Sequence, residues 1–328
     1  MRKFFASLTV TLLCLASAAF AQSVHQNSSG YTPQRVFDAK EKKFSDFEAM
    51  LADLARAEIV FVGEQHDDPA THRLERAILE GLARRQRPVI LALEMFERDT
   101  QKPLDDYLAG KLSEEEFLKV SRPWPRYATD YRPLIEMAKA HQWRVVAGNV
   151  PRKYASQVSR NGLAVLDTLP AEERKLIAAQ HPCPMDDYFK RFVEAMSEHP
   201  GADDKKPAKE PTKEELEKQR SMVEKFYHAQ CVKDETMAES IAAAYNEAPA
   251  PKPVIVHYNG AFHSDYKFGT AARAKQRLPK AIHKVVSIVP LDNLDAINVD
   301  EYRKRGDYIV FTIKPAKPAK AETKTETK

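Results

Sequence analysis

Two glycine–histidine pairs share a spacing that could place imidazoles over the edge of a sheet. Gly63 stands three residues before His66, and Gly260 stands three residues before His263. A glycine lets the chain turn sharply, so the following histidine can point back toward the strand it has just left. Histidine nitrogens, together with carboxylate oxygens, are ligands that suit divalent transition metals. The repeated spacing therefore indicates a metal site.

Two glutamates could complete this site. Glu64 directly follows Gly63, and Glu94 ends a separate apolar run. A metal-bound water is a nucleophile near neutral pH, and a spare carboxylate can act as its general base. We therefore predict His66, His263 and Glu94 as metal ligands, and Glu64 and Glu94 as catalytic residues. The alternative stays open that each of these groups only serves a helix N-terminus or a hydrogen bond.

Short apolar runs must supply the strands that position these residues. Such runs occur at 59–62, 89–93, 145–147, 254–256, 284–289 and 308–313. Continuous apolar strands separated by helical segments are typical of a parallel sheet covered on both faces. Ligands bind outside the carboxyl ends of such strands, which is where the two glutamates stand. We expect an α/β fold, with a mainly parallel sheet, helices on both faces and a smaller helical cap domain.

Composition shifts outline the domain organisation. We expect one α/β domain over residues 34–313, with helical insertions at about 97–133 and 165–247. A segment rich in Pro, Lys and Asp at 200–211 predicts a mobile linker. The Lys-, Pro- and Thr-rich stretch 314–328 predicts a disordered tail.

The first 21 residues are typical of a signal peptide, with Arg2 and Lys3 before a short apolar run. We therefore expect export to the periplasm, or association with the outer membrane. No cysteine that could accept a lipid is evident, so membrane attachment stays open. Cys183 and Cys231 could form a disulfide in an oxidising compartment or remain separate thiols, and the sequence leaves both open.

The charge balance argues against one class of partner. The net charge is +4, with 51 basic and 47 acidic residues, and much of the surplus lies in the terminal segments. No basic surface of the kind that binds nucleic acid is indicated.

Aromatic and basic residues alternate around Tyr131, where Trp124 and Tyr127 are interleaved with arginines. A planar apolar ligand such as haem needs residues of this kind, because a tyrosinate can bind its iron and arginines can pair with its propionates. The alternative is that these tyrosines only pack the helical cap.

Several segments carry a resemblance to a known family. The sequence resembles the ChaN-like family of haem-binding uptake proteins. The superfamily of that family also holds the Tiki proteases and the erythromycin esterases. The resemblance covers about residues 34–290. The segments that carry it are VFVGEQHDDPATHRLE from Val60, LALEMFERDTQKPLDDYLAG from Leu91, DYRPLIEMAKAHQWRVVAGNVPR from Asp130, AQCVKDETMAESIA from Ala229 and VHYNGAFHSDY from Val256.

The resemblance implies a haem-binding protein of iron acquisition, with a tyrosine on the iron and two haems stacked across a homodimer. No motif places that tyrosine, and Tyr131 and Tyr188 are our candidates for it. A haem receptor or transporter would then be a partner. The Tiki branch is similar in using two Gly-x-x-His motifs and a glutamate for a divalent metal, which here match Gly63/His66, Gly260/His263 and Glu94. Two hypotheses follow: an exported haem-binding protein, and a metal-dependent hydrolase that uses the His and Glu residues at the strand ends.

Overall fold

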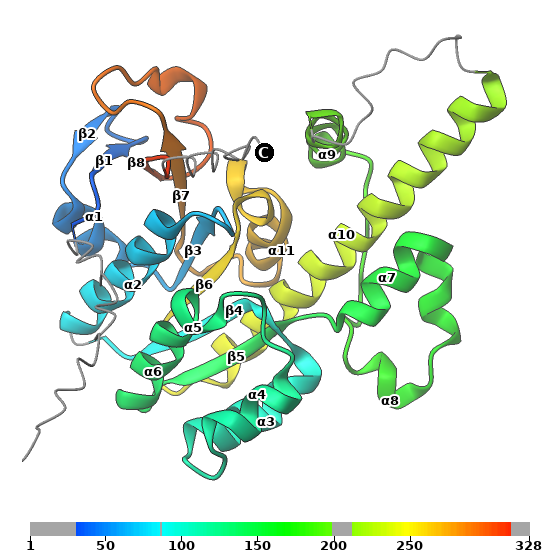
Figure 1. The fold of residues 1–328 in the computed structure, drawn as a ribbon, viewed down its shortest axis with the longest axis horizontal. Coiled ribbons are helices and arrows are strands. Elements are labelled where there is room, and N and C mark those ends of the chain that lie inside the picture. Colours follow the sequence, from blue (N-terminus) through cyan, green and yellow to red (C-terminus); the bar gives the residue numbers. More distant parts are fainter. Residues whose placement is uncertain (1–30, 86, 199–211, 316–328) are drawn as a thin grey trace, which may run out of the picture. The chain divides into compact units, whose positions relative to one another are not determined.

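An eight-stranded sheet forms the centre of the part of the chain that the computed structural model describes, residues 31–85, 87–198 and 212–315. Its strand order is β2-β1-β8-β7-β3-β6-β4-β5 (Figure 1). The strands are β1 Gln34–Asp38, β2 Lys43–Ser45, β3 Ile59–Glu64, β4 Val89–Glu97, β5 Arg144–Asn149, β6 Val254–Gly260, β7 His283–Leu291 and β8 Tyr308–Ile313.

The strands from β8 to β5 in this order run parallel to one another, whereas β1 is antiparallel to both β8 and β2. The predicted fold class is therefore confirmed, and all six apolar runs form strands. The hairpin of β1 and β2 was not predicted. Phe44 of β2 pairs with Phe37 of β1 across this hairpin. The following helix begins at Phe47, where Asp46 caps its first turn.

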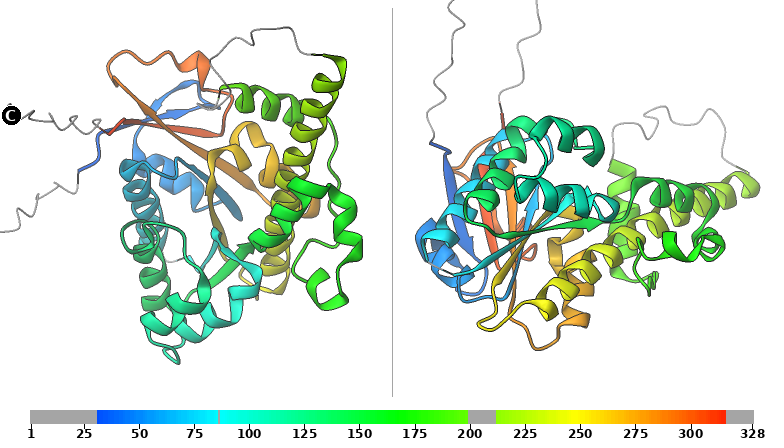
Figure 2. Two further views of the ribbon diagram at one scale, coloured as in Figure 1. Left: turned by 45° about the vertical axis from the view of Figure 1, so that its right-hand side comes forward. Right: turned by 90° about the horizontal axis from the view of Figure 1, so that it is seen from below.

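Six helices cover one face of the sheet. Their apolar side chains share a single hydrophobic cluster with Val60, Leu91 and Val256 from the central strands. The insertion predicted at about 97–133 is helical, and its helices belong to this layer (Figure 2). The helices are α1 Phe47–Leu54, α2 Pro69–Arg84, α3 Gln101–Leu108, which follows the short turn η1 Arg98–Thr100, α4 Glu114–Ser121, α5 Tyr127–Asp130 and α6 Arg132–Ala140.

The C-terminal half of the long helix α10 (Lys213–Glu247) covers the other face with α11 (Gly269–Arg277). The N-terminal half of α10 runs on past α7 (Arg152–Asn161) and beside α9 (Asp187–Glu198) (Figure 1). A separate hydrophobic cluster joins α7, the segment after it and α10. Two shorter helical segments, η2 Leu163–Thr168 and α8 Ala171–Arg174, follow α7 in the chain. The predicted insertion at 165–247 stays a prediction.

Cys183 and Cys231 form a disulfide that ties the segment before α9 to the middle of α10. Beside it, Tyr188 and Phe192 of α9 pack on Tyr227 of α10. The disulfide therefore holds α9 against α10.

Among the described residues, no helix combines the length and the apolar character that crossing a membrane requires. The predicted signal peptide, the predicted linker at 200–211 and almost all of the predicted tail lie outside the described residues.

Candidate functional site

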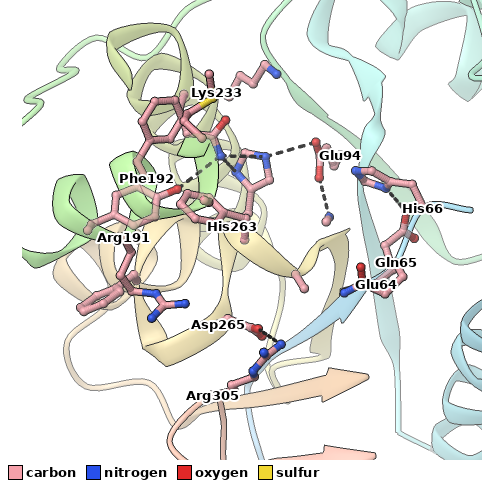
Figure 3. Close-up of a pocket in the computed structure, with 18 of the residues that line it drawn as sticks. Glu64, Gln65, His66, Glu94, Arg191, Phe192, Lys233, His263, Asp265 and Arg305 are labelled. Carbon is pink, nitrogen blue, oxygen red and sulfur yellow. Dashed lines mark hydrogen bonds and ion pairs between the residues drawn. The ribbon is translucent and has the colours of Figure 1, made fainter. Parts of the chain in front are cut away.

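Three neighbouring parallel strands end at one edge of the sheet. β6 lies between β3 and β4, and Glu64 at the end of β3 is in register with Gly260 at the end of β6. His263 follows on the short turn η3 (Ala261–His263), and Glu94 comes from β4. Figure 3 shows Glu94 between His263 on one side and His66 on the other. The strand order therefore brings the four predicted residues to one edge.

Glu64 and His66 form a hydrogen-bonded pair. His66 Nδ1 donates to Glu64 Oε1 at 2.5 Å, and the Tyr131 hydroxyl donates to the same oxygen at 3.0 Å. The carboxylate is buried, whereas the His66 side chain is 47% exposed. Burial alone would lower the pKa of His66, but the hydrogen bond to Glu64 and the charges of Glu94 and Glu64 raise it. The pair can take up a proton at Nε2, as a general base does.

The imidazole of His66 lies directly against Gly260. A Cβ atom at position 260 would fall 2.8 Å from His66 Nε2 and 3.6 Å from Glu94 Oε2. Any side chain larger than hydrogen would therefore displace His66. The glycine also brings its backbone N–H to Glu94 Oε2, to which it donates at 2.7 Å.

His263 lies between two buried carboxylates. Its Nδ1 donates to Asp234 Oδ1 at 2.7 Å, and its Nε2 lies 3.3 Å from Glu94 Oε1. Burial works against the charged imidazole, but Glu94 and Asp234 raise the pKa of His263 to about 10. Burial would also raise the pKa of Glu94, yet His263 holds it well below its usual range. His263 is therefore an imidazolium that can donate a hydrogen bond or stabilise negative charge.

A second group of ionisable side chains lies behind Glu64, away from His66. His72 Nδ1 is 2.8 Å from Glu75 Oε2 and 3.9 Å from Glu64 Oε2. His72 Nε2 is 3.1 Å from the His66 carbonyl oxygen and 3.3 Å from Asp130 Oδ2. Burial and the neighbouring Glu64 raise the pKa of Glu75 well above its usual value. His72 thus contacts both the backbone of His66 and the Glu64 carboxylate. Both of these contacts orient the His66 ring.

A cavity of about 770 Å³ opens onto this edge of the sheet. Aromatic side chains form part of its wall, namely Trp124, Tyr188, Phe192, Phe262 and Phe268. Basic side chains also face it. Arg152, Arg191 and Lys233 have no carboxylate oxygen of the described residues within 4.0 Å, and Arg305 pairs with Asp265 at 3.4 Å. The cavity thus combines an aromatic wall with three basic side chains that form no ion pair among the described residues, while Glu64, Glu94 and Asp265 add acidic groups to its lining.

The two predicted tyrosines differ in their relation to this cavity. Tyr188 lines it, and its hydroxyl donates to Asp234 Oδ2 at 2.9 Å. Burial, followed by the charge of Asp234, raises the pKa of Tyr188 well above its usual value. Tyr131 is not among the lining residues, and its hydroxyl donates to Glu64, which does line the cavity. Tyr188 is therefore the better placed of the two for a ligand in the cavity.

The predicted metal ligands lie at one edge but are not a tight cluster. Among the described residues, the group of His, Cys, Asp and Glu side chains whose ligand atoms all lie within 4.8 Å of one another is Glu64, His72 and Glu75. His66 pairs with Glu64, whereas His263 pairs with Glu94. Metal binding by His66, His263 and Glu94 stays a prediction.

Sequence reasoning gave no role to several residues of this site. Asp234 and Gln230 match positions of the resembled family but could not be assigned a function, and they turn out to contact His263 and Tyr188. His72 and Glu75 were not singled out. Their spacing of three residues on a helix places them on one face, which is a signal that could have found them.

Comparisons with known proteins find a relative that matches most of this chain. At 26% identity over 247 residues, it is similar to Protein RETICULATA-RELATED 5, chloroplastic, of Arabidopsis thaliana. The match covers 72% of this chain and 32% of that protein, so the chain spans about a third of the relative's length. We draw no activity from this relative.

Two solved structures are also similar. One is described as cofacial heme binding to ChaN of Campylobacter jejuni, with a TM-score of 0.59, 16% identity, and coverage of 86% of this chain and 97% of that one. The other is a mutant of the erythromycin esterase EreC in its open conformation, with a TM-score of 0.42, 13% identity, and coverage of 86% and 83%. The first of these likenesses shows the fold.

The family itself is shown by a family model. The model described as "Haem-binding uptake, Tiki superfamily, ChaN" matches residues 50–274, which include β3, β4, β6 and every residue of the site described above except Arg305. The resemblance seen in the sequence is thus confirmed, and this chain belongs to the ChaN family of haem-binding uptake proteins in the Tiki superfamily.

Proposed function

We propose that this chain binds haem in the cavity between α9, α10 and the ends of β3, β4 and β6, and that it serves iron acquisition. One observation carries the proposal: aromatic side chains line the same cavity of about 770 Å³ as Arg152, Arg191 and Lys233, which form no ion pair with the residues that the structure describes. A planar ligand with carboxylate groups matches both features, because its rings can pack on the aromatic wall while its anionic groups meet arginine and lysine.

The residues of the cavity fit haem. Phe192, Phe262 and Phe268 offer apolar contacts, and Arg152, Arg191 and Lys233 offer partners for propionates. Haem, when bound, supplies an iron that accepts axial ligands from the protein. Tyr188 is the tyrosine that we propose for this role, since it lines the cavity and Tyr131 does not.

The setting of this activity is also part of the proposal. The signal-peptide pattern of the first 21 residues and the disulfide between Cys183 and Cys231 support a protein that acts outside the cytoplasm, in the periplasm or at the outer membrane. A haem receptor or transporter and a second copy of the chain are the partners that we propose.

The test is a haem titration followed by absorbance. Purified protein freed of haem is mixed with haemin, and we expect a shifted Soret band that saturates at one or two haems per chain, with a Kd of about 1 μM or lower. A spectrum equal to that of free haemin at all concentrations would refute the proposal.

The arrangement of Glu64, His66, Glu94 and His263 favours a second candidate, a metal-dependent hydrolase. His66 is backed by the Glu64 carboxylate, its Nε2 lies near Glu94, and His263 approaches the same glutamate at 3.3 Å. A carboxylate that orients a histidine through its other nitrogen is the usual support of a metal ligand.

Elemental analysis of protein purified without added metal tests this candidate. If the site holds a cation, H66A and H263A each lower the metal content of the protein. Unchanged metal content in both variants would exclude it, whatever the haem titration shows.

A further inference from the structure

A compact group of ligand atoms lies next to the cavity that we propose for haem. Of its three side chains, Glu64 lines that cavity, whereas His72 and Glu75 are not among the lining residues. Glu64 Oε2, His72 Nδ1 and a carboxylate oxygen of Glu75 all lie within 4.8 Å of one another. All three side chains are buried, with 5% of His72 and at most 1% of each glutamate exposed. Atoms that bind one ion at about 2.0–2.2 Å lie about 3 to 4 Å apart, so the spacing matches a single cation.

The local sequence explains why these three side chains meet. Glu64 ends β3, and the chain turns into α2 within a few residues, with Asp68 capping the helix and Pro69 in its first turn. His72 and Glu75 lie three residues apart on α2 and so face the same side of the helix. The strand end and the first two turns of the helix thus build the group from twelve consecutive residues, 64–75.

One oxygen of each glutamate lacks a donor. Glu64 Oε2 and Glu75 Oε1 are buried and accept no hydrogen bond from another residue's donor among the described residues, whereas Glu75 Oε2 accepts from His72 Nδ1 at 2.8 Å. A buried carboxylate oxygen without a partner is costly, since it has lost water and gained nothing in exchange. A cation placed between the two glutamates and His72 would satisfy both oxygens.

The other oxygen of Glu64 and the other nitrogen of His72 already have hydrogen-bond partners. Glu64 Oε1 accepts from His66 Nδ1 and from the Tyr131 hydroxyl. His72 Nε2 lies within hydrogen-bond distance of the His66 carbonyl oxygen and near Asp130. Ligands in metal sites are oriented in this way, with the second histidine nitrogen bonded to a carbonyl or a carboxylate. Glu64 Oε2 and Glu75 Oε1 are the oxygens left for an ion. Such an ion would replace the hydrogen bond from His72 Nδ1 to Glu75 Oε2 at 2.8 Å.

We propose that Glu64, His72 and Glu75 bind a divalent transition-metal ion next to the cavity. One imidazole nitrogen and two carboxylates suit Zn²⁺ or Mn²⁺. The ion would fix the Glu64 carboxylate and, through it, the orientation of His66. It is distinct from a metal held by His66, Glu94 and His263, because Glu64 Oε2 and His72 lie on the other side of Glu64 from the His66 ring.

The test measures Zn²⁺ and Mn²⁺ binding by haem-free protein, so that its result does not depend on haem. Each ion is added after chelator treatment, and bound metal is determined after gel filtration. We expect about one equivalent of one of these ions in the wild type and in H66A and H263A. We expect at least about tenfold weaker binding in H72A and E75Q. E80Q is the matched control, because Glu80 lies on the same helix and pairs with Arg76 at the surface.

A diffraction experiment keeps the proposal testable if the variants fail to fold. Anomalous scattering from crystals of the wild type grown with Zn²⁺ locates the ion directly. A peak within about 2.5 Å of Glu64, His72 and Glu75 is expected. A peak at Glu94 and His263 instead, the absence of any bound ion, or wild-type affinity in folded H72A and E75Q would overturn the proposal.

Discussion

The Tyr188 hydroxyl donates to Asp234 Oδ2 at 2.9 Å, and the other oxygen of Asp234 accepts from His263 at 2.7 Å. A tyrosine on the wall of the cavity is thereby connected to the histidine at the end of β6. This connection joins the part of the molecule that we assign to haem with the residues that resemble a metal site.

Replacing this tyrosine tests its role directly. In Y188F the ring stays and the hydroxyl is lost, so we expect the Soret band of the haem complex to shift and the Kd to rise about tenfold or more. Y131F is the matched control: Tyr131 also donates to a carboxylate, but it does not line the cavity. Absorbance titration of both variants with haemin measures this difference. Equal spectra for Y188F and the wild type would exclude Tyr188 as the iron ligand.

The disulfide is expected to support the wall of the cavity. Cys183 and Cys231 are 48 residues apart in the sequence, for which loop closure predicts a stabilisation of about 4 kcal/mol. The free energy of unfolding of C183S/C231S, measured in urea, should be lower than that of the wild type by an amount of this order. Because the bond holds α9 against α10, haem affinity should fall as well.

The same disulfide prediction has a simple control. Reductant added to the wild type should reproduce the behaviour of C183S/C231S, and reductant added to the variant should change nothing. Haem affinity that stays the same in C183S/C231S would show that packing alone holds α9 in place.

The stability of the fold should depend on His263 at alkaline pH. The pKa of His263 in the folded chain is about 10, above the value of about 6.5 expected when it is unfolded. The charged form therefore stabilises the fold fully below about pH 6.5, and this contribution is lost as the pH rises toward 10. For one proton the slope is at most about 1.4 kcal/mol per pH unit.

Comparison with H263Q isolates this contribution from other groups that titrate. We expect the difference in unfolding free energy between the wild type and H263Q, measured in urea, to shrink between pH 7 and pH 10. A difference that stays constant over this range would contradict the ion pairs of His263 with Glu94 and Asp234.

Gly260 should be intolerant of a side chain as long as His66 is present. In G260A the new methyl group would fall 2.8 Å from His66 Nε2, and such overpacking costs about 1–3 kcal/mol. In H66A the imidazole is gone, so the same substitution should cost much less. A double-mutant cycle of unfolding free energies measures this coupling. Additive effects would mean that His66 does not lie against Gly260.

The location of the site could be predicted because it depends on features that are local in the sequence. The runs before Glu64 and Glu94 are continuous and apolar, so they mark buried strands, and a parallel sheet collects the residues after such strands at one edge. The two Gly-x-x-His spacings then singled out His66 and His263. No knowledge of how helices pack was needed for this step.

The remaining residues could not be predicted, because their roles depend on contacts between distant segments. Asp234 lies within α10 and meets His263 only because that helix crosses the end of β6. Tyr131 and Tyr188 each directly follow an aspartate in the sequence. Only the packing of α5 and α9 decides that one faces Glu64 and the other faces the cavity.

The short strands β1 and β2 were missed for a related reason. β1 is five residues long and β2 three, and most of their residues are not buried, so they lack the continuous apolar run that marked the central strands. The pairing of β1 with the distant β8 stabilises them.

The most direct test of the central claim compares haem binding after two equal changes of charge. R191E/K233E places two negative charges in the cavity, and R76E/R84E places two on the exposed side of α2. If haem binds in the cavity, its Kd should rise about tenfold or more in R191E/K233E and stay within about twofold of the wild type in R76E/R84E. Equal affinities in the wild type and R191E/K233E would contradict haem binding in this cavity.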